Sequence, residues 1–582
     1  MTSGTIFKLT YLLRLIGLVC VASLFSMSNA VAGDAEDAHR QLTEADFPTA
    51  SKCGTCHERI YGEWSSSSHA NAAISPVFHK FEQAINNLAP TISHFCVRCH
   101  ISVGTALGEP REMNTWDRSQ VSREGVTCVV CHRVATAYYK SNGQRQLVPG
   151  DIFQPVFGAN DNKNLKNVIA DADHYKVTTN TKTRGKKIHT DAIKNTQLNK
   201  SEFCASCHQV AVNLGIKLEV VWDQYRGSPA HAEGTTCQEC HMGKVPGVKS
   251  GYDQDYIAVI KGKPVGEKVD HHNHAFFGPG YSIAHPGLFP HNPDAENFEP
   301  EVWLKFDYRA GWGTEEFEEK IEDGSIKVTF PEEWEDSADR EDARAIVETN
   351  LERTREKAEL RKQVMENGSH LDGPFFKSEK KVGENLVFKY TLKNLNNGHN
   401  LPSGSLGAQP ELWLNVVLAD PNGKNIWESG YVDSHGDMCD LHSLDVRAGT
   451  IKHDDQLFNL QTKFLTTNVK GTDREMYLPV NFDLDQLPQL RPPAQPTTVM
   501  NHPPFVRMEG RSLPPLASRD ANYKVPAELM TQPGTYKMSA RLRSRAEPIY
   551  FMRFIGATPE MEQAMNEWMI DMHAYSVEFE VK

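Results

Sequence analysis

The sequence lacks the features of several large classes of protein. Beyond its N-terminal segment it has no apolar run that could span a bilayer, and its mean hydropathy of −0.50 excludes a polytopic membrane protein. The net charge is −13 and no basic block is present, which argues against a nucleic-acid-binding protein. No Ser-His-Asp, phosphate-loop or paired-carboxylate pattern stands out. With 39% hydrophobic residues, the chain is still too apolar for wholesale disorder.

Cysteine is also scarce, at 12 in 582 residues, which is too few for a disulfide-dense scaffold. Its placement is informative, because ten of the twelve lie in five Cys-x-x-Cys-His pentapeptides. In chain order, the residues of these motifs are Cys53, Cys56 and His57; Cys96, Cys99 and His100; Cys128, Cys131 and His132; Cys204, Cys207 and His208; and Cys237, Cys240 and His241.

Each pentapeptide has the composition of a covalent haem site. Two thiols three positions apart in a tight turn can each add to a haem vinyl group, and the adjacent histidine then reaches the iron as its proximal ligand. Zinc ribbons, redox dithiols and disulfides are the alternatives, but none of them needs a histidine after every second cysteine. Five such pentapeptides are not expected by chance. The sequence therefore predicts five covalently attached haems c with their iron ions.

The density of the motifs predicts the architecture around them. All five lie between Cys53 and His241, which leaves roughly 40 residues for each haem. So short a stretch cannot bury five macrocycles in separate apolar pockets, so the haems must supply much of the core and touch one another. We expect mostly loops and short helices there. Closely packed haems would form a continuous path for electrons.

An internal repeat relates two pairs of motifs. The motif starts are separated by 43, 32, 76 and 33 residues, so the second interval nearly equals the fourth. Each pair has a Phe directly before its first cysteine, a Trp between its motifs and a Glu-Gly-x-Thr before its second motif. We interpret this as a duplicated di-haem module, about His79–His132 and His189–His241. His79 and His189 lie 17 and 15 residues before the first cysteine of their modules, which predicts matching roles as distal ligands.

Five irons need distal ligands, and the 24 histidines supply more than enough of them. Methionine is the alternative sixth ligand. His69 is a candidate because it follows Trp-Ser-Ser-Ser-Ser directly after the first motif, and His274 because it lies in a cluster downstream of the last one, with His272 as the runner-up. His399 lies in a Gly-His-Asn-Leu-Pro-Ser-Gly loop, which at a strand end is well placed to reach a neighbouring domain. The reserve candidates are His94, His174 and His231.

Residues 1–32 have the composition of a cleavable secretory signal. Lys8 and Arg14 form a sparse positive region, Leu15–Met27 is apolar, and Ser28–Ala32 offers small-residue cleavage sites. An uncleaved anchor is the alternative, but the apolar run is short for a span of roughly 20 residues. Haem c is attached outside the cytoplasm, which agrees with export. We therefore expect a periplasmic, extracellular or cell-surface protein with no transmembrane segment in its mature chain.

Four stretches carry a resemblance to a known family, and together they cover roughly residues 50–285. They are Trp64–His69, Glu124–His132, Ser201–His208 and Gly234–Met242. These stretches resemble multihaem cytochromes c of the cytochrome c554 type, a group akin to the hydroxylamine oxidoreductase superfamily. The resemblance implies bis-histidine haems in stacked and perpendicular pairs, and electron transfer. The chain has five motifs, not the eight of octahaem oxidoreductases, and lacks the Cys-x-x-Cys-Lys site of pentahaem nitrite reductases, which argues against a dedicated substrate-turning haem.

The remainder of the chain consists of two parts that differ in their sequence pattern. Residues 291–379 are predicted to be a linker with a long helix, which Ser337 or Asp339 caps and which runs to Asn367-Gly368 with a left-handed stop there. In residues 380–582, alternating apolar runs and an Asp-Pro-Asn-Gly turn predict strands. We expect the Pro-rich stretch 488–515 to be a loop and 559–573 to be a late helix. This part resembles the β-sandwich often fused to such cytochromes.

The odd cysteine of this part is Cys439, which lies near His435, His442 and His453. A metal site is one interpretation. The favoured one is an inert, buried cysteine in a long loop.

The predicted fold class is multidomain: a haem-packed, mostly helical and loop-rich cytochrome domain over residues 33–290, then the helical linker and an all-β sandwich-like domain. The favoured function is an exported pentahaem c-type cytochrome that relays electrons through closely packed bis-histidine haems. The alternative is a multihaem oxidoreductase with one open haem that acts on a small nitrogen or sulfur compound. A third hypothesis gives the β-sandwich a docking role. Expected partners are redox proteins or a small electron acceptor or donor, and a homo-oligomer is compatible with the sequence.

Overall fold

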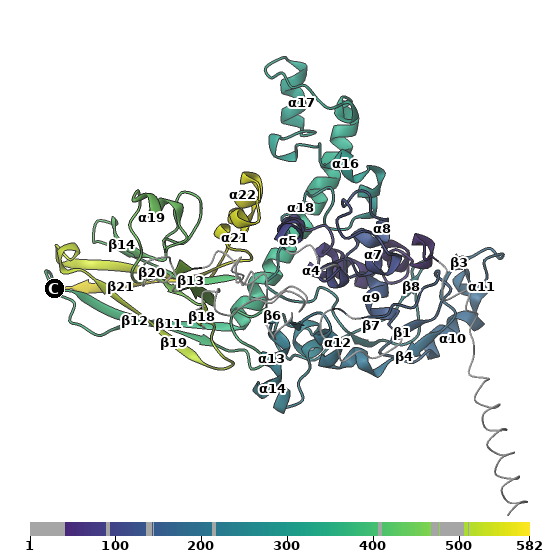
Figure 1. Cartoon of the computed structure of the whole chain (residues 1–582), viewed down its shortest axis with the longest axis horizontal. Coiled ribbons are helices and arrows are strands. Elements are labelled where there is room, and N and C mark those ends of the chain that lie inside the picture. Colours follow the sequence, from purple (N-terminus) through teal and green to yellow (C-terminus); the bar gives the residue numbers. More distant parts are fainter. Residues whose placement is uncertain are drawn as a thin grey trace, which may run out of the picture. The chain divides into compact units, whose positions relative to one another are not determined.

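Helices dominate the first half of the chain and strands the second (Figure 1). The computed structural model describes residues 41–88, 94–134, 143, 145–211, 217–404, 410–466, 476–477, 506–509 and 511–582. The predicted signal segment, residues 1–32, lies outside the described residues, and residues 44–582 pack as one unit. Within the described part of the chain, no helix combines the length and the apolarity that crossing a bilayer requires.

The region that contains the five motifs is built from short elements. Its helices are α2 (Ala50–Gly54), α3 (Glu58–Ser65), α4 (Ser68–Asn71), α5 (Pro76–Leu88), α6 (Val97–His100), α7 (Ser102–Leu107), α8 (Gln120–Arg123), α9 (Cys128–His132), α10 (Lys163–Ala170), α11 (Ala172–Tyr175), α12 (Ser201–Ala205), α13 (Val221–Arg226), α14 (Pro229–Ala232) and α15 (Cys237–His241). Its strands are β1 (Val156–Gly158), β2 (Val177–Thr178), β3 (Lys186–Lys187), β4 (Ala192–Lys194), β5 (Val210–Ala211), β6 (Lys217–Glu219), β7 (Asp253–Asp255), β8 (Val259–Ile260), β9 (Lys263–Pro264) and β10 (Val269–His271). These strands form two-stranded ladders, of which β1-β4 and β2-β3 are parallel.

Buried apolar side chains of the motif region lie partly in small clusters. Three clusters among its described residues contain five, five and four buried side chains. A cluster centred on the strands of the second half contains 27.

A linker of short helices and one long helix follows. Its elements are η6 (Pro293–Asn297), α16 (Pro300–Trp303), η7 (Tyr308–Ala310), α17 (Glu315–Glu322), η8 (Glu332–Trp334) and α18 (Ser337–Asn367). The indoles of Trp303, Trp312 and Trp334 are buried together in a cluster that also includes Phe306 and Phe317. Aromatic side chains thus give this segment a core of its own.

Helix α18 differs from the prediction at both ends. Its N-cap is Asp336, not Ser337 or Asp339, because the carboxylate of Asp336 accepts a hydrogen bond from the backbone N–H of Ala338 at 2.9 Å, and Ser337 is the first helical residue. Gly368 follows the last helical residue with φ −88°, so the expected left-handed stop is wrong. The chain instead continues directly into strand β11 (Ser369–Phe376), which leaves no room for a reversal of the chain.

The second half of the chain forms antiparallel sheets. The remaining strands are β12 (Leu386–Asn394), β13 (Glu411–Ala419), β14 (Asn425–Ser429), β15 (Phe458–Asn459), β16 (Lys463–Thr466), β17 (Met476–Tyr477), β18 (Val506–Glu509), β19 (Ser518–Val525), β20 (Gly534–Arg545) and β21 (Ile570–Val581). One sheet has the order β11-β12-β19, a second β14-β13-β20-β21 with β15 also on β13, and a third β17-β16-β18. The helices of this part are α19 (Leu444–Ala448), α21 (Ile549–Phe554) and α22 (Pro559–Glu567).

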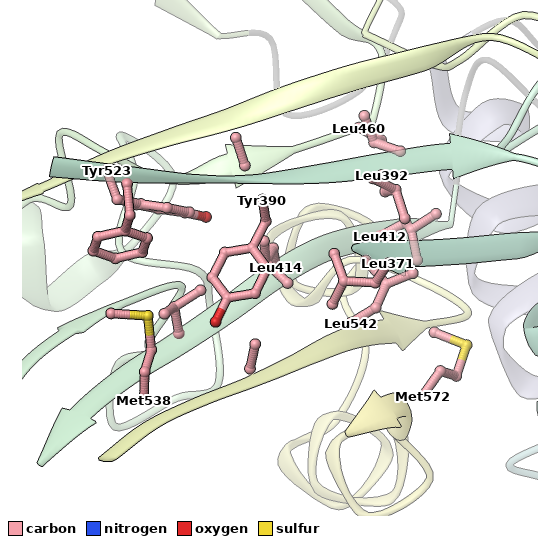
Figure 2. Close-up of a cluster of buried hydrophobic side chains, with 14 of the residues drawn as sticks. Leu371, Tyr390, Leu392, Leu412, Leu414, Leu460, Tyr523, Met538, Leu542 and Met572 are labelled. Atoms are coloured by element: carbon pink, nitrogen blue, oxygen red, sulfur yellow. The ribbon is translucent and has the colours of Figure 1, made fainter. Parts of the chain in front are cut away.

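Side chains of the first two sheets share one hydrophobic core (Figure 2). Alternate residues of β12, such as Tyr390 and Leu392, are buried, as the period of a strand requires. They belong to the same cluster as Leu412 and Leu414 of β13 and Leu542 of β20. Two sheets that bury facing side chains in this way form a sandwich. The predicted class, a helical and loop-rich region followed by a β-sandwich-like region, is therefore confirmed.

Two smaller predictions for this region are wrong. Strand β18 lies within the Pro-rich stretch 488–515 that was expected to be all loop, because Val506–Glu509 itself lacks proline and can pair with β16. Helix α22 ends at Glu567, and the rest of the helix expected over 559–573 belongs to β21, where Met572 pairs with Leu542 of β20. In both cases, pairing with a strand that is distant in the sequence determines the secondary structure.

Candidate haem centres

Each Cys-x-x-Cys-His motif adopts a helical turn. Helices α9 and α15 consist of a motif each, and α6 contains four residues of another. The N–H groups of His57 and His208 donate to the carbonyls of Cys53 and Cys204 at 3.0 Å. Residues i, i+3 and i+4 of such a turn lie on one face. The two thiols and the imidazole of each motif are therefore presented together. All ten motif cysteines are thiols and are partly exposed.

The proximal histidines are oriented by backbone carbonyls. Because a carbonyl oxygen can only accept, the Nδ1–H of the imidazole must donate, and Nε2 is left as the ligand nitrogen. Four of the five motif histidines make this bond: His57 to Ile257 at 2.7 Å, His132 to Phe157 at 2.7 Å, His241 to Phe277 at 2.5 Å and His100 to Ala72 at 3.3 Å. Burial lowers the pKa of all four and lowers the pKa of His208 to about 4, so each imidazole is neutral at pH 7.

Three of the predicted distal histidines lie opposite a motif histidine. The ring-centroid distances are 6.2 Å for His69 and His208, 6.4 Å for His132 and His274, and 6.0 Å for His241 and His399. An imidazole nitrogen binds a metal ion at about 2 Å, and the ring centroid lies about 1.1 Å behind that nitrogen, so two imidazoles on opposite sides of one ion have centroids about 6.3 Å apart. The three observed distances are close to this value.

The distal imidazoles of these three pairs are also in the neutral form that can bind a metal ion. The Nδ1–H of His274 donates to the carbonyl of His272 at 2.6 Å, and that of His399 donates to the carbonyl of Asn400 at 2.9 Å. Burial lowers the pKa of His69 and His274 to about 3 and the pKa of His399 to about 4. The Nδ1 of His69 is buried without a hydrogen-bond partner among the described residues. Protonation, which would prevent ligation, is therefore strongly disfavoured.

His189 and His79, which the repeat relates, differ in their surroundings. Burial and then the charge of nearby His57 lower the pKa of His189 to about 4, which associates His189 with the first motif. His79 instead uses its Nε2–H to donate to the carbonyl of Ala73 at 2.6 Å, and the same nitrogen lies 2.9 Å from Oγ1 of Thr115. Ligation through that nitrogen would require both contacts to break.

The other histidines named from the sequence have aromatic or backbone neighbours. His272 packs on Tyr252 with ring centroids 4.0 Å apart, and His231 lies edge-on to Tyr225 at 5.2 Å. His174 lies edge-on to Tyr175 at 5.0 Å, and Nε2 of His94 is 3.3 Å from the carbonyl oxygen of Glu109.

The glycine of the repeated Glu-Gly-x-Thr sequence has a backbone role. Gly125 and Gly234 have φ values of +68° and +73°, a left-handed conformation that favours glycine. The turn at Gly125 allows the next residue, Val126, to donate its N–H to the carbonyl of His69 at 3.0 Å. The left-handed glycine therefore connects the third motif to the loop that presents a distal histidine.

Thiols of different motifs lie close to one another. The pKa values of Cys53 and Cys128, of Cys99 and Cys207, and of Cys204 and Cys237 are shifted by interaction within each pair. These contacts place the first motif beside the third, the second beside the fourth, and the fourth beside the fifth.

Arg145 adds the link between the third and fourth motifs. Its guanidinium donates to the carbonyl of Val130 at 3.3 Å and to Oγ of Ser206 at 2.6 Å. Together with the thiol contacts, this residue connects all five motifs into one cluster. No motif in the sequence marks Arg145, because its role depends on contacts between distant segments.

Part of the chain matches a known protein family. Residues 52–133 match the family model described as cytochrome c554 and c-prime. The matched stretch includes the first three motifs complete, from Cys53 to His132. This stretch is therefore similar to the cytochromes of that family. The predicted resemblance to the cytochrome c554 type is confirmed over this stretch.

A penta-heme cytochrome c552 from Thermochromatium tepidum is similar in structure, with a TM-score of 0.48 and 15% sequence identity over 91% of this chain and 99% of that chain. No curated protein matches the sequence.

The residues of the motifs fit haem c as the cofactor. Each motif presents two thiols for thioether bonds beside a neutral imidazole, and in four of the five a backbone carbonyl accepts from Nδ1–H and leaves Nε2 available. Haem iron supplies a one-electron redox couple when it is bound. The residues therefore suit both the covalent attachment and the ligation of haem.

The odd cysteine lies apart from the motifs, in the β region. Cys439 is buried, as expected, and burial raises the pKa of its thiol to about 12, which makes it unreactive. In the same loop, ligand atoms of Asp433, His435 and Asp445 lie within 4.8 Å of one another. Their carboxylates already accept hydrogen bonds from serine hydroxyls of this loop.

Proposed function

We propose that the protein is an exported pentahaem cytochrome c that relays electrons between redox partners. The observation that carries the proposal is the set of three imidazole pairs with centroids 6.0–6.4 Å apart, each of which joins a motif histidine to a distal histidine. An iron with two histidine ligands has no open position for a substrate, so it exchanges electrons only. Bis-histidine ligation therefore favours a carrier over an enzyme.

The proposed ligand pairs extend this pattern to all five motifs. They are His57 with His189, His100 with His79, His132 with His274, His208 with His69, and His241 with His399. The last three pairs are supported by the distance between their ring centroids. The first pair is supported by the charge of His57, which helps to lower the pKa of His189. The second pair rests on the sequence repeat.

The contacts between motifs support a branched order for the relay. The interaction between the thiols of Cys53 and Cys128 relates the first motif to the third, and Arg145 relates the third to the fourth. The fourth motif then contacts the second through Cys99 and the fifth through Cys237. The protein holds the imidazoles in fixed orientations through backbone carbonyls, which limits reorganisation when an electron arrives.

The proposed haem centre of the second motif supports a second candidate function. Because Nε2 of His79 already contacts Ala73 and Thr115, His79 is the least prepared of the five proposed distal ligands. If His79 does not bind, the iron beside His100 has an open position. The protein would then be an oxidoreductase that acts there on a small nitrogen or sulfur compound.

Export is part of the proposal. The sequence of residues 1–32 and the need to attach haem c outside the cytoplasm support a periplasmic, extracellular or cell-surface location. The partners of a carrier of this kind are redox proteins or a small electron donor or acceptor.

The test uses the mature protein from a host that attaches haem c. Intact mass should equal the polypeptide without residues 1–32 plus five haems. Dithionite should reduce all five irons, and nitrite, hydroxylamine, sulfite and cyanide should leave the absorption spectrum unchanged. A smaller haem count would refute the pentahaem proposal. Binding of one of the small molecules by a single iron would favour the oxidoreductase.

A further inference from the structure

We propose that Glu63 is the positioning residue for His274, the distal ligand proposed for the third motif. The inference rests on the proposed pairing of His132 with His274, and it names the group that holds this distal ligand in place. Glu63 lies outside every motif, on helix α3, and is 211 residues from His274 in the sequence.

The carboxylate of Glu63 accepts hydrogen bonds from three groups. Its Oε2 accepts from the backbone N–H of His274 at 2.9 Å. Its Oε1 accepts from the Nε2–H of His271 at 2.7 Å and from the Nε–H of Arg59 at 3.0 Å. The side chain of Glu63 is only 13% exposed, so water competes little for these bonds. Hydrogen bonds to a charged acceptor are also about twice as strong as those between neutral groups.

His274 has few other hydrogen bonds. Its ring donates the Nδ1–H to the carbonyl of His272, which belongs to the same loop. Among the described residues, Glu63 is the only one outside residues 272–277 that forms a hydrogen bond with His274. The bond to His272 therefore orients the imidazole, and the bond to Glu63 fixes the backbone that carries it.

Two neighbours of His274 in the loop are bound to the fifth motif instead. The N–H of Asn273 donates to the carbonyl of Met242 at 2.8 Å, and the N–H of Phe277 donates to the carbonyl of His241 at 2.9 Å. His241 is the last residue of the fifth motif, and Met242 follows it. These bonds attach the loop to the fifth motif, whereas His274 would bind the iron of the third. The position of His274 therefore depends on a contact that the fifth motif does not provide.

Glu63 itself is held by two secondary-structure elements. It lies on α3, which directly follows the first motif. Arg59, one helical turn before Glu63, also donates to Asp255 at 2.7 Å and to Asp253 at 3.2 Å. Both aspartates belong to β7, which pairs with β10, and β10 ends at His271. The carboxylate is therefore fixed between a helix and a two-stranded ladder before it meets His274.

Loss of the carboxylate should release the distal ligand. A hydrogen bond to a charged group is strong enough to change an equilibrium roughly ten- to a hundredfold. The population in which His274 is detached should rise by about this factor when the bond is lost. Cyanide can bind the iron only in that population, so the rate of cyanide binding reports how firmly His274 is held.

Substitutions of Glu63 separate positioning from charge. Glu63→Ala removes the acceptor, whereas Glu63→Gln removes the charge but keeps a carbonyl oxygen within reach of the N–H of His274. Glu63→Asp, whose side chain is one methylene shorter, is the second variant if Glu63→Ala does not fold. Arg59→Met removes another partner of the carboxylate and leaves the bond to His274 intact. Glu58→Ala is the matched control, because Glu58 is an exposed carboxylate on the same helix.

The measurement is the rate of cyanide binding to each oxidised holoprotein, with the low-spin signals counted by electron paramagnetic resonance. In Glu63→Ala, cyanide should bind one iron about tenfold or more faster than it binds any iron of the wild type. Glu63→Asp should show a smaller increase, and Glu63→Gln, Arg59→Met and Glu58→Ala should behave as wild type. The inference is overturned if Glu63→Ala, or Glu63→Asp in its place, loses stability but binds cyanide no faster. It is also overturned if Glu63→Gln reacts as fast as Glu63→Ala.

A variant that combines Glu63→Ala with His274→Ala identifies the iron concerned. It should have one reactive iron, as His274→Ala alone does, and a second reactive iron would contradict the assignment of Glu63 to this centre. The proposed function is checked separately by His274→Ala. If that variant keeps every iron low-spin, the pairing with His132 is refuted. If it opens an iron and Glu63→Ala does not, only the role of Glu63 is refuted.

Discussion

At the scale of single residues, ring orientation decides which histidines can act as iron ligands. His132 and His274 illustrate the arrangement, because each donates its Nδ1–H to a backbone carbonyl, at 2.7 and 2.6 Å, and their rings are 6.4 Å apart. Both rings therefore keep Nε2 available as the ligand atom. The neighbouring His272 has its ring against Tyr252 at 4.0 Å instead.

Substitution of His274 tests this arrangement. His274→Ala should convert one low-spin iron to high spin, because no second imidazole remains opposite His132. His274→Met should keep six ligands and raise the potential of one haem, since thioether ligation favours the reduced iron. The matched control, His272→Ala, should change neither quantity. If His272→Ala rather than His274→Ala produced the high-spin iron, the pairing would be wrong.

His285 illustrates a buried histidine with a structural role. Its Nε2–H donates to the carbonyl of Phe306 at 2.9 Å, and its Nδ1 accepts from the N–H of Gly287 at 3.0 Å. Burial lowers its pKa to about 4. Between pH 6.5 and pH 4 the unfolded chain therefore binds a proton that the folded chain does not, so stability is lost as the pH falls through this range.

The pH dependence gives a measurable expectation. Between pH 7 and pH 5, His285 should cost the folded protein about 2 kcal/mol. His285→Gln, which can still donate to Phe306, should lose less stability than the wild type over this interval by about that amount. Urea unfolding of both proteins at the two pH values measures the difference. An equal loss in both proteins would show that His285 is not the group responsible.

At the scale of elements, helix α18 connects the linker and the motif region through polar side chains. Its buried residues include Arg340, Asn350, Lys357 and Arg361, which recur at helical spacing. Asn350 donates to the carbonyl of Pro286 and Arg361 to that of Pro279, at 2.6 Å each. This helix is therefore positioned by specific hydrogen bonds more than by apolar contact.

The buried ion pair between α17 and α18 should matter to stability. Glu318 and Arg340 are hydrogen-bonded, with side chains 10% and 3% exposed. Glu318→Ala leaves a buried charge unpaired and should destabilise the protein by about 3–5 kcal/mol. The control is Glu316→Ala, which breaks an exposed pair with Lys320 and should cost less than about 1 kcal/mol. Chemical denaturation measures both, and equal effects would contradict the buried pairing.

Prediction from sequence works best for elements whose pattern is local. Strand β12 was predicted because its apolar residues alternate, and the motif turns because five residues define each of them. Strand β18 and the end of α22 were missed because pairing with distant strands decides them. Arg145 was missed for the same reason: it is placed between the third and fourth motifs only by tertiary contacts.

At the scale of the whole molecule, the β-sandwich region contributes to the motif cluster. His399 comes from the loop that follows β12, and its ring lies 6.0 Å from that of His241, at an angle of 14°. The carbonyl of His399 accepts from Nδ2 of Asn394 at 3.1 Å, and the N–H of Asn400 donates to Gln224 of the motif region at 3.2 Å. Hydrogen bonds to the β region and to the motif region therefore both position this loop.

Substitution of His399 tests whether the β region completes a haem centre. His399→Ala should retain five haems and convert one of them to a high-spin iron that binds cyanide. His370→Ala on strand β11, an exposed histidine of the same region, is the control and should bind no cyanide. A fully low-spin His399→Ala protein would assign the β region a docking role only.

The most direct test of the central claim is the electron paramagnetic resonance spectrum of the oxidised wild-type protein, integrated against its haem content. Five irons with two imidazoles each should give low-spin signals that account for all five, with no high-spin component. A high-spin signal equal to one iron would contradict the carrier and support the oxidoreductase with an open position beside His100.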